Sequence, residues 1–435
     1  MIVFLVVFPL VLVGFGYAAY AVAGLAASAF LSWGLQPAYG TALANVVFLM
    51  LVFVMLTATG LTIGERKWSA LMQNRIGPNR IRPFGNPLAG LPYILADGLK
   101  TLTKENIQPS ARSKFLYEMA PVISLAPAFA LFAVIPVGPR VAVSGQQVAL
   151  QVASPDAGLL YLFAIASLAV YGTSIAGWAS NNKLAILGGV RASSQMISYE
   201  VSLGLSLVGA MMAYGTLRLE EMSVAQGKLL WGVLPQLGFI LQPVGLVLFF
   251  ASAFAETKRA PFDLPEGESE IVGYFVEYPG MKFAMMMLAE FIEVVVLAGV
   301  TVAVFLGGWH PIVFEGWLKA NLSPLAFAAV CAGAFMLKTI ALAWLQLVIR
   351  WTLPRFRFDQ IQKLCWKMML PFALANVFLT GALVLADPTL EWLAIVGIVE
   401  IVALVALTAA ATKAPEPAHG EHGHGGAHAA PAHGH

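Results

Sequence analysis

Long apolar stretches recur along this chain, and they constrain its fold more than any other feature. A helix needs roughly 20 apolar residues to cross a hydrocarbon layer about 30 Å thick. We therefore expect an all-α, polytopic membrane helix bundle with about ten transmembrane helices. The candidate spans are residues 2–31, 42–63, 120–137, 159–179, 196–214, 233–254, 283–307, 325–349, 368–385 and 392–411.

The composition agrees with a membrane protein and excludes several other classes. Charged residues make up 11% of the chain, against about 25% in a soluble domain. Cys331 and Cys365 lie far apart without CxxC spacing, so no iron–sulfur, zinc or covalent haem site is visible, and we expect no metal site. A net charge of +2 without a basic patch gives no case for nucleic acid. No glycine-rich nucleotide fingerprint is present either, so any redox cofactor belongs to a partner.

Basic residues are divided unequally between alternate loops, and this division predicts which loops lie on the cytoplasmic side of the membrane. The loops at 64–119, 180–195, 255–282 and 350–367 hold 19 Lys and Arg residues, whereas the opposite loops hold four. The positive-inside rule makes the first set cytoplasmic, and ten spans then place both termini inside. Because no Lys or Arg precedes Arg66, the first span lacks the basic region of a signal peptide.

The loop at 64–119 is predicted to contain a surface helix. Its first part holds Gly77, Pro78, Pro83, Gly85 and Pro87, which favour turns. Leucines then recur at steps of three and four, with charged residues off that stripe, as in an amphipathic helix on the membrane surface. A helix packed on the protein's own loops stays open and is compatible with it. The stripe is formed by Leu88, Leu91, Leu95, Leu99 and Leu102, and the charges by Asp97, Lys100 and Lys104.

The tail at 413–435 is rich in Ala, Gly, Pro and His and holds six of the seven histidines. Histidine clusters bind transition metals, so metal binding is one interpretation. Nothing in the segment could bury a core, which favours a disordered tail without an essential function.

Several ionisable residues interrupt the apolar spans. A charge at the centre of a bilayer costs roughly 2.5–3.5 kcal/mol on insertion scales, so each one requires an explanation. A structural ion pair or hydrogen bond explains a single residue, and we favour it for Glu293 and Glu400. The others as a group fit a proton path, whose members change protonation with a neighbour's charge. They are Glu200, Glu290 and Lys338.

The stretch AETKRAPFDLPEGESE, residues 255–270, adds a dense acidic loop at the end of the sixth span. Glu256 lies at the membrane edge, and Lys258 and Arg259 follow it. A solvated charged loop is the ordinary interpretation of such a run. However, APFDLP is apolar and stiffened by prolines, and the sequence after it is also apolar. These features indicate a segment that packs under a partner or lines a cavity.

Four blocks in order resemble one known family. They are GERKWSALMQNRIGPNR, SNNKLAILGGVRASSQMISYE, AETKRAPFDLPEGESEIVGYFVEYPGMKFAMMMLAEF and RWTLPRFRFDQ. The chain resembles the H subunit of NADH-quinone oxidoreductase, respiratory complex I, over a domain at residues 42–386. This resemblance leaves an extra N-terminal segment at 1–41, an extra C-terminal segment at 387–412 and the tail outside the family domain.

The resemblance implies a multi-pass subunit of a bacterial cell inner membrane, where the hydrophilic arm of complex I meets the membrane arm. Members of this family contribute to the quinone-binding chamber and couple quinone reduction to proton translocation through buried carboxylates. The resemblance implies an H⁺-translocating enzyme whose active site is completed by other subunits. The partners are peripheral-arm and small membrane subunits of complex I, quinone and the lipid bilayer, with FMN and iron–sulfur clusters in partner subunits.

The resemblance also carries residue roles onto matching motifs. Asn106 and Ser167 stand where some relatives have acids, so the acidic chain could be thinner here, or use water and Glu105. The implied proton-coupling residues, together with the lysine in the eighth span, are Glu65, Asp97, Glu200, Glu256, Glu266, Glu268, Glu270, Glu290 and Lys338. The implied quinone-chamber residues are Arg66, Arg75, Arg191, Arg259 and Arg355.

Two other functions compete with this interpretation. The homologous membrane subunit of a membrane-bound hydrogenase or related dehydrogenase would share the helices and carboxylates. A stand-alone ion carrier would use the charges without redox chemistry, but no inverted internal repeat is visible. The choice between ubiquinone and menaquinone, the electron donor and the proton stoichiometry are not encoded in any motif here.

Overall fold

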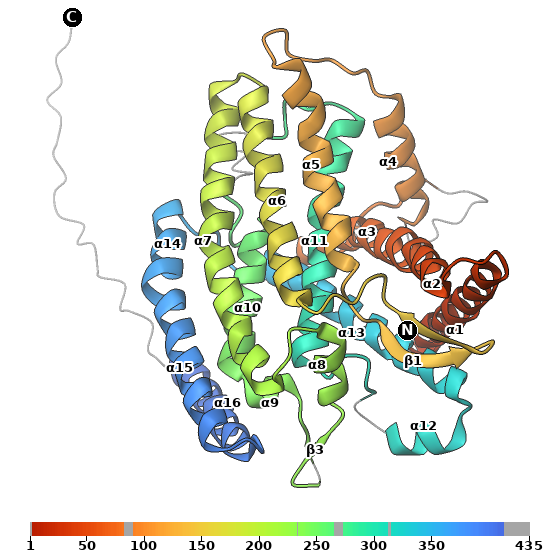
Figure 1. The fold of residues 1–435 in the computed structure, drawn as a ribbon. Coiled ribbons are helices and arrows are strands. Elements are labelled where there is room, and N and C mark those ends of the chain that lie inside the picture. The colour runs from red at the N-terminus through yellow and green to blue at the C-terminus, as the bar shows by residue number, and fades with distance from the viewer. Residues whose placement is uncertain (1, 82–89, 233, 265–272, 312–314, 413–435) are drawn as a thin grey trace, which may run out of the picture.

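Long helices dominate the fold (Figure 1). The computed structural model describes residues 2–81, 90–232, 234–264, 273–311 and 315–412. Within these ranges, nine helical stretches are long and apolar enough to cross a membrane, so the predicted all-α membrane bundle is confirmed. They are α1 (Ile2–Ser32), the continuous α2 (Pro37–Asn45), η1 (Val46–Val54) and α3 (Met55–Met72), α5 (Lys114–Phe132), α6 (Gly158–Ala179), α7 (Lys183–Tyr214), α11 (Met281–Phe305), α13 (Pro324–Thr352), the continuous α14 (Phe358–Lys363), η4 (Leu364–Met369) and α15 (Leu370–Ala386), and α16 (Glu391–Thr412).

The predicted span at 233–254 is wrong in its extent. The helix found there, α10 (Pro243–Glu256), has 14 residues and is about 21 Å long, which is shorter than the hydrocarbon layer. Gln242 breaks the helix with φ −142° and ψ 59°, and Pro243 after it has no N–H to continue a helix from before. The chain ahead of α10 forms β3 (Leu229–Leu230), β4 (Leu234–Pro235) and α9 (Gly238–Leu241).

The short connecting elements gather at one end of the bundle. Figure 1 shows α8, β3 and α12 at the bottom of the view and the turn between α6 and α7 at the top. Which end of the bundle faces the cytoplasm stays a prediction. The further connecting elements are β1 (Gly138–Val143) and its antiparallel partner β2 (Gln146–Leu150), α8 (Leu219–Ala225) and α12 (Glu315–Asn321).

Helix α11 forms the centre of the bundle (Figure 1). Every residue from Ala289 to Phe305 is buried, and the helix packs against α3, α5, α10 and α13. A helix buried on all sides meets protein and not lipid. The carboxylates on α11 therefore lie in the protein interior, where neighbouring side chains set their protonation.

Helices α6 and α7 approach each other closely beside α11. A Cβ atom on Gly177 would lie 2.7 Å from the carbonyl oxygen of Ala185 and 3.2 Å from the Cα atom of Gly189. Small residues at such crossings let membrane helices pack backbone to backbone. This packing fixes α7, which carries Glu200, against α6.

The predicted surface helix is present as α4 (Pro92–Thr103). The side chains of Leu91, Leu95, Leu99 and Leu102 are all at least 60% exposed. An exposed leucine stripe fits a helix that rests on lipid. The helix also contacts α3 and α11, so it packs on the bundle, and its position on the membrane surface stays a prediction. Leu88 and the turn residues Pro83, Gly85 and Pro87 lie outside the described residues.

Candidate functional site

The carboxylate of Glu65 joins three parts of the chain near the end of α3. It accepts a hydrogen bond from Nη1 of Arg259 at 2.9 Å and another from Nη1 of Arg350. Arg259 follows α10, and Arg350 lies in the last turn of α13. Arg259 also packs over the ring of Phe291 at 4.0 Å. Two guanidinium groups share one carboxylate here, so the junction carries net positive charge.

A second ion pair ties the surface helix to the bundle. Nη2 of Arg66 lies 2.8 Å from Oδ2 of Asp97, and the guanidinium of Arg66 lies 4.8 Å from the ring centroid of Tyr93. Arg66 directly follows Glu65 on α3, whereas Asp97 and Tyr93 belong to α4. The pair therefore holds α4 beside the Glu65 junction.

An apolar cleft of about 450 Å³ opens between α3, α4 and α11. Aliphatic and aromatic side chains line most of it, and charged groups lie among them at the end of α3. The cleft has the form expected of a site for a long apolar ligand with a polar end group. Its charged residues are Glu65, Arg66 and Asp97, and its apolar residues include Ile94, Leu102, Ala284, Met287, Leu288 and Phe291.

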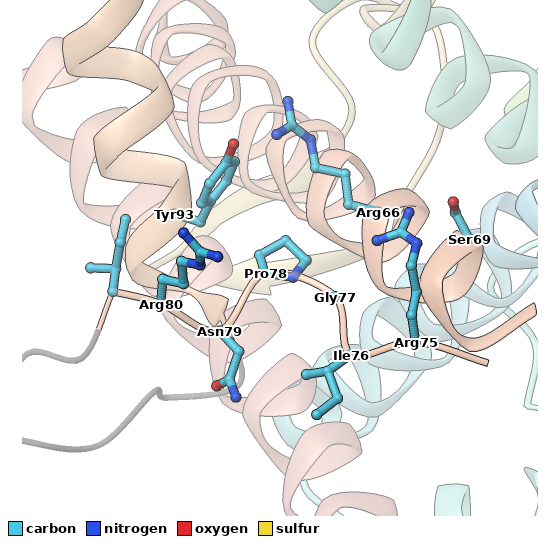
Figure 2. Close-up of a pocket in the computed structure, with 10 residues that line it drawn as sticks. Arg66, Ser69, Arg75, Ile76, Gly77, Pro78, Asn79, Arg80 and Tyr93 are labelled. Atoms are coloured by element: carbon cyan, nitrogen blue, oxygen red, sulfur yellow. The ribbon is translucent and has the colours of Figure 1, made fainter. Parts of the chain in front are cut away.

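A basic pocket of about 470 Å³ adjoins this cleft (Figure 2). Figure 2 shows the loop from Arg75 to Arg80 passing the end of α3, with Arg66 and Arg75 on one side and Arg80 and Tyr93 on the other. Arg66 lines both the pocket and the cleft. An apolar cavity thus meets a cationic cavity at the side chain of Arg66.

A buried ion pair lies behind the Glu65 junction. Nζ of Lys258 is 3.6 Å from Oε1 of Glu290, and both side chains are at most 4% exposed. The hydroxyl of Tyr274 donates to the same oxygen of Glu290 at 3.3 Å. Burial alone would lower the pKa of Lys258, but Tyr274, Glu293 and Glu290 together raise that pKa above its ordinary value. Lys258 therefore stays a cation inside the protein.

A small cavity of about 20 Å³ brings three carboxylates together. Glu200 comes from α7, Glu256 from the end of α10 and Glu293 from α11. Apolar side chains of α5, α6, α7 and α11 form the rest of the wall. Carboxylates around a common cavity can exchange a proton when the charge near one of them changes.

Comparison with known proteins connects this arrangement to a family. The family model described as NADH dehydrogenase matches residues 44–381. The chain belongs to the NADH dehydrogenase family. It is 43% identical to the NADH-quinone oxidoreductase H subunit 1 of Geobacter metallireducens, over 76% of this chain and 93% of that protein. Similar values hold for the H subunit 1 of Cytophaga hutchinsonii (42%, covering 74% and 91%) and the H subunit of Leptospira biflexa (43%, covering 79% and 94%).

The site residues predicted for the NADH dehydrogenase family fall into two groups in the structure. Glu65, Arg66, Asp97 and Arg259 meet around the cleft, and Arg75 lines the adjoining basic pocket. The buried carboxylates Glu200, Glu256 and Glu290 lie behind them. Glu266, Glu268 and Glu270 lie outside the described residues.

Three predicted residues do not line the cleft, the basic pocket or the carboxylate cavity. Nζ of Lys338 donates to the carbonyl oxygens of Leu306, Gly308 and His310 at 2.8–3.0 Å. It thereby binds the C-terminal end of α11, about 24 Å along the helix from Glu290. Arg355 is exposed between α13 and α14, and Arg191 is half-buried on α7. The proton-coupling role of Lys338 and the chamber roles of Arg191 and Arg355 stay predictions.

The structure adds three residues to the predicted site: Arg350, which the sequence analysis did not name, and Lys258 and Glu293, to which it gave no site role. Arg350 shares Glu65, Lys258 pairs with Glu290, and Glu293 lines the carboxylate cavity. Glu293 follows Glu290 by three residues, a spacing that signals a shared side of the helix. No sequence pattern indicates that Arg350 and Glu65, far apart in the chain, lie close together.

Metal ligation has no candidate among the described ranges. In that part of the chain no group of three or more His, Cys, Asp and Glu side chains is placed to hold a metal ion. Both cysteines are free thiols and buried.

Proposed function

We propose that this chain is the H-type membrane subunit of a proton-translocating NADH-quinone oxidoreductase. It contributes to the quinone-binding chamber and couples quinone reduction to proton movement. The observation that carries this proposal is the apolar cleft that meets a basic pocket at Arg66, with buried carboxylates behind it. The names of the three relatives favour this enzyme over a membrane-bound hydrogenase.

The cleft fits the two chemically distinct parts of a quinone. Its apolar side chains, contributed by a surface helix and two buried helices, suit an isoprenoid tail that enters from the bilayer. Arg66 and the basic pocket beyond it suit a head group whose oxygens become negative on reduction. Partner subunits complete the chamber, and their FMN and iron–sulfur clusters supply the electrons.

The charged segment from Glu256 to Arg259 links the chamber to the protein interior. Arg259 binds Glu65 at the cleft, Lys258 pairs with Glu290, and Glu256 lines the small cavity. Two unit charges about 10 Å apart interact by about 1.7 kcal/mol at an effective dielectric constant of 20. That energy shifts a protonation equilibrium by roughly tenfold or more. A charge formed in the chamber can therefore move protons among these carboxylates.

The same proposal implies a cellular location for the chain. We infer a bacterial inner membrane, with the basic loops and both termini on the cytoplasmic side, an arrangement that requires the 14-residue α10 to complete a tenth crossing. The family domain at 42–386 then carries the function, and the segments at 1–41 and 387–412 add helices around it.

The test is Glu256→Gln in the assembled complex, with quinone reduction and proton pumping measured together. Glutamine keeps the shape of the side chain but cannot carry the proton, so we expect pumping to fall by about tenfold or more. Glu118→Gln is the control, because Glu118 is an exposed carboxylate paired with Lys282. Wild-type rates of both reactions in Glu256→Gln would remove Glu256 from the path.

A further inference from the structure

A second apolar cavity, with a volume of about 540 Å³, is a surface groove between α10 and α13. It shares no lining residue with the cleft between α3, α4 and α11. Its wall is aliphatic and aromatic except for Thr301, whose hydroxyl donates to the carbonyl oxygen of Leu297 on its own helix. Val247, Leu345 and Leu353 in this wall are at least 40% exposed. An exposed apolar groove of this kind marks a site for an apolar ligand or partner.

The length of the groove matches one leaflet of a bilayer. Along α13 it extends from Leu342 to Leu353, a rise of about 16 Å, whereas the whole hydrocarbon layer is about 30 Å thick. A transmembrane helix of a partner crosses both leaflets, but the acyl chains of a phospholipid end near the centre of the bilayer. The groove therefore fits acyl chains better than a partner helix.

A basic pocket of about 500 Å³ adjoins the groove near the end of α13. Phe356 and Leu364 line both cavities, and Lys363 and Lys367 line the pocket. Nζ of Lys363 lies 3.5 Å from a carboxylate oxygen of Asp359, whereas Lys367 has no carboxylate within ion-pair distance among the described residues. The apolar groove thus ends at an ammonium group that no side chain neutralises.

The chain around this pocket has the charge and the aromatic residues of a membrane interface. The segment 355–367 holds two Arg, two Lys and one Asp, a net charge of +3. Clusters of Lys and Arg beside a membrane span attract anionic lipid head groups. Trp351 and Trp366, which are 39% and 51% exposed, belong to the residue type that prefers the head-group level. The pocket therefore lies where a lipid head group would meet it.

We propose that the groove and the basic pocket together bind one anionic phospholipid. Its acyl chains lie along α10 and α13, and its phosphate accepts hydrogen bonds from the ammonium groups of Lys363 and Lys367. The head group of phosphatidylcholine carries its own cation beside the phosphate, so the site favours phosphatidylglycerol over phosphatidylcholine. This inference goes beyond the proposed function and does not depend on it.

The first experiment uses the assembled complex in phosphatidylcholine nanodiscs that contain a small fraction of phosphatidylglycerol with a photoreactive acyl chain. We expect light to label peptides of α10 and α13, and unlabelled phosphatidylglycerol, but not added phosphatidylcholine, to displace the label. The double variant Lys363→Gln with Lys367→Gln should lower labelling by about tenfold, because both attractive charges are lost. Lys114→Gln with Lys183→Gln is the matched control, because it removes the same charge from two other exposed lysines. Label is counted per assembled complex, so that a loss of folding is not counted as a loss of binding.

The second variant blocks the groove and leaves both lysines in place. Ala251 lines the groove, so Ala251→Phe should lower labelling several-fold, whereas Ala284→Phe in the cleft should leave it unchanged. Unchanged labelling in both the lysine variant and Ala251→Phe would overturn the proposal, as would equal displacement by the two lipids. Labelling confined to partner subunits would show that a partner covers the groove and would also overturn it. None of these measurements needs quinone turnover, so their outcome is separate from that of the proposed function.

Discussion

At the scale of single residues, the interior of this protein contains two kinds of glutamate. Glu290 is fixed by Lys258 and Tyr274, whereas Glu256 and Glu293 each keep one buried oxygen without a hydrogen-bond partner among the described residues. A paired carboxylate stabilises the fold by neutralising a buried cation, and an unpaired one can change its protonation. The sequence shows three similar acids in apolar surroundings, and only their neighbours from other helices separate them.

The buried pair gives a prediction about stability. Lys258→Met leaves Glu290 without its cation in a dry site, which should destabilise the protein by about 3–5 kcal/mol. Lys282→Met is the matched control, because its partner Glu118 is 52% exposed and such pairs contribute at most about 1 kcal/mol. Thermal melting of the assembled complex measures both. Equal melting temperatures would show that Lys258 and Glu290 do not form a stabilising pair, and Lys258→Met with Glu290→Leu should recover part of the loss.

At the scale of elements, the position of the surface helix α4 beside α3 and α11 forms the apolar cleft. Its leucine stripe is exposed, and Asp97 ties it to α3 through Arg66. The sequence predicted an amphipathic helix here from its period, but not the cleft beneath it. That cleft exists because α4 and α11, far apart in the chain, both lie beside α3.

The cleft gives a prediction about quinone affinity. Ala284 lines it, so Ala284→Phe should fill part of the space and raise KM several-fold for a long-tailed quinone, with a smaller effect for a short-tailed one. Ala251→Phe is the matched control, because Ala251 lines a different apolar groove between α10 and α13. Steady-state rates with both quinones give the comparison. An equal rise of KM for both tail lengths would argue against tail binding in the cleft.

At the scale of the whole molecule, the bundle is arranged around α11. This helix contacts α3, α5, α10 and α13, and its residues line both the apolar cleft and the small cavity that Glu200 of α7 also lines. The segment from Glu256 to Arg259 joins these regions because each of its charged side chains bonds to, or lines a cavity with, a different helix.

The whole molecule also gives a prediction about assembly. A chain that completes a chamber with partners should copurify with an NADH-oxidising flavoprotein, iron–sulfur subunits and bound quinone. Mild detergent extraction followed by identification of the bound proteins and lipids measures this. Recovery with a hydrogenase, or as a stable single chain that carries ions, would contradict the proposed function.

The sequence by itself determined the membrane bundle, nine of its spans, the surface helix and the family. Each of these depends on local composition, on a period along one helix or on an ordered motif, all of which one chain segment contains. The sequence misplaced the sixth span, because hydropathy alone does not register the break at Gln242 and Pro243. Only the tertiary structure decided which carboxylates are paired, which line a cavity and where the cleft lies. These properties depend on distances between helices that are remote in the chain, and the free energy of a buried charge is set by those neighbours.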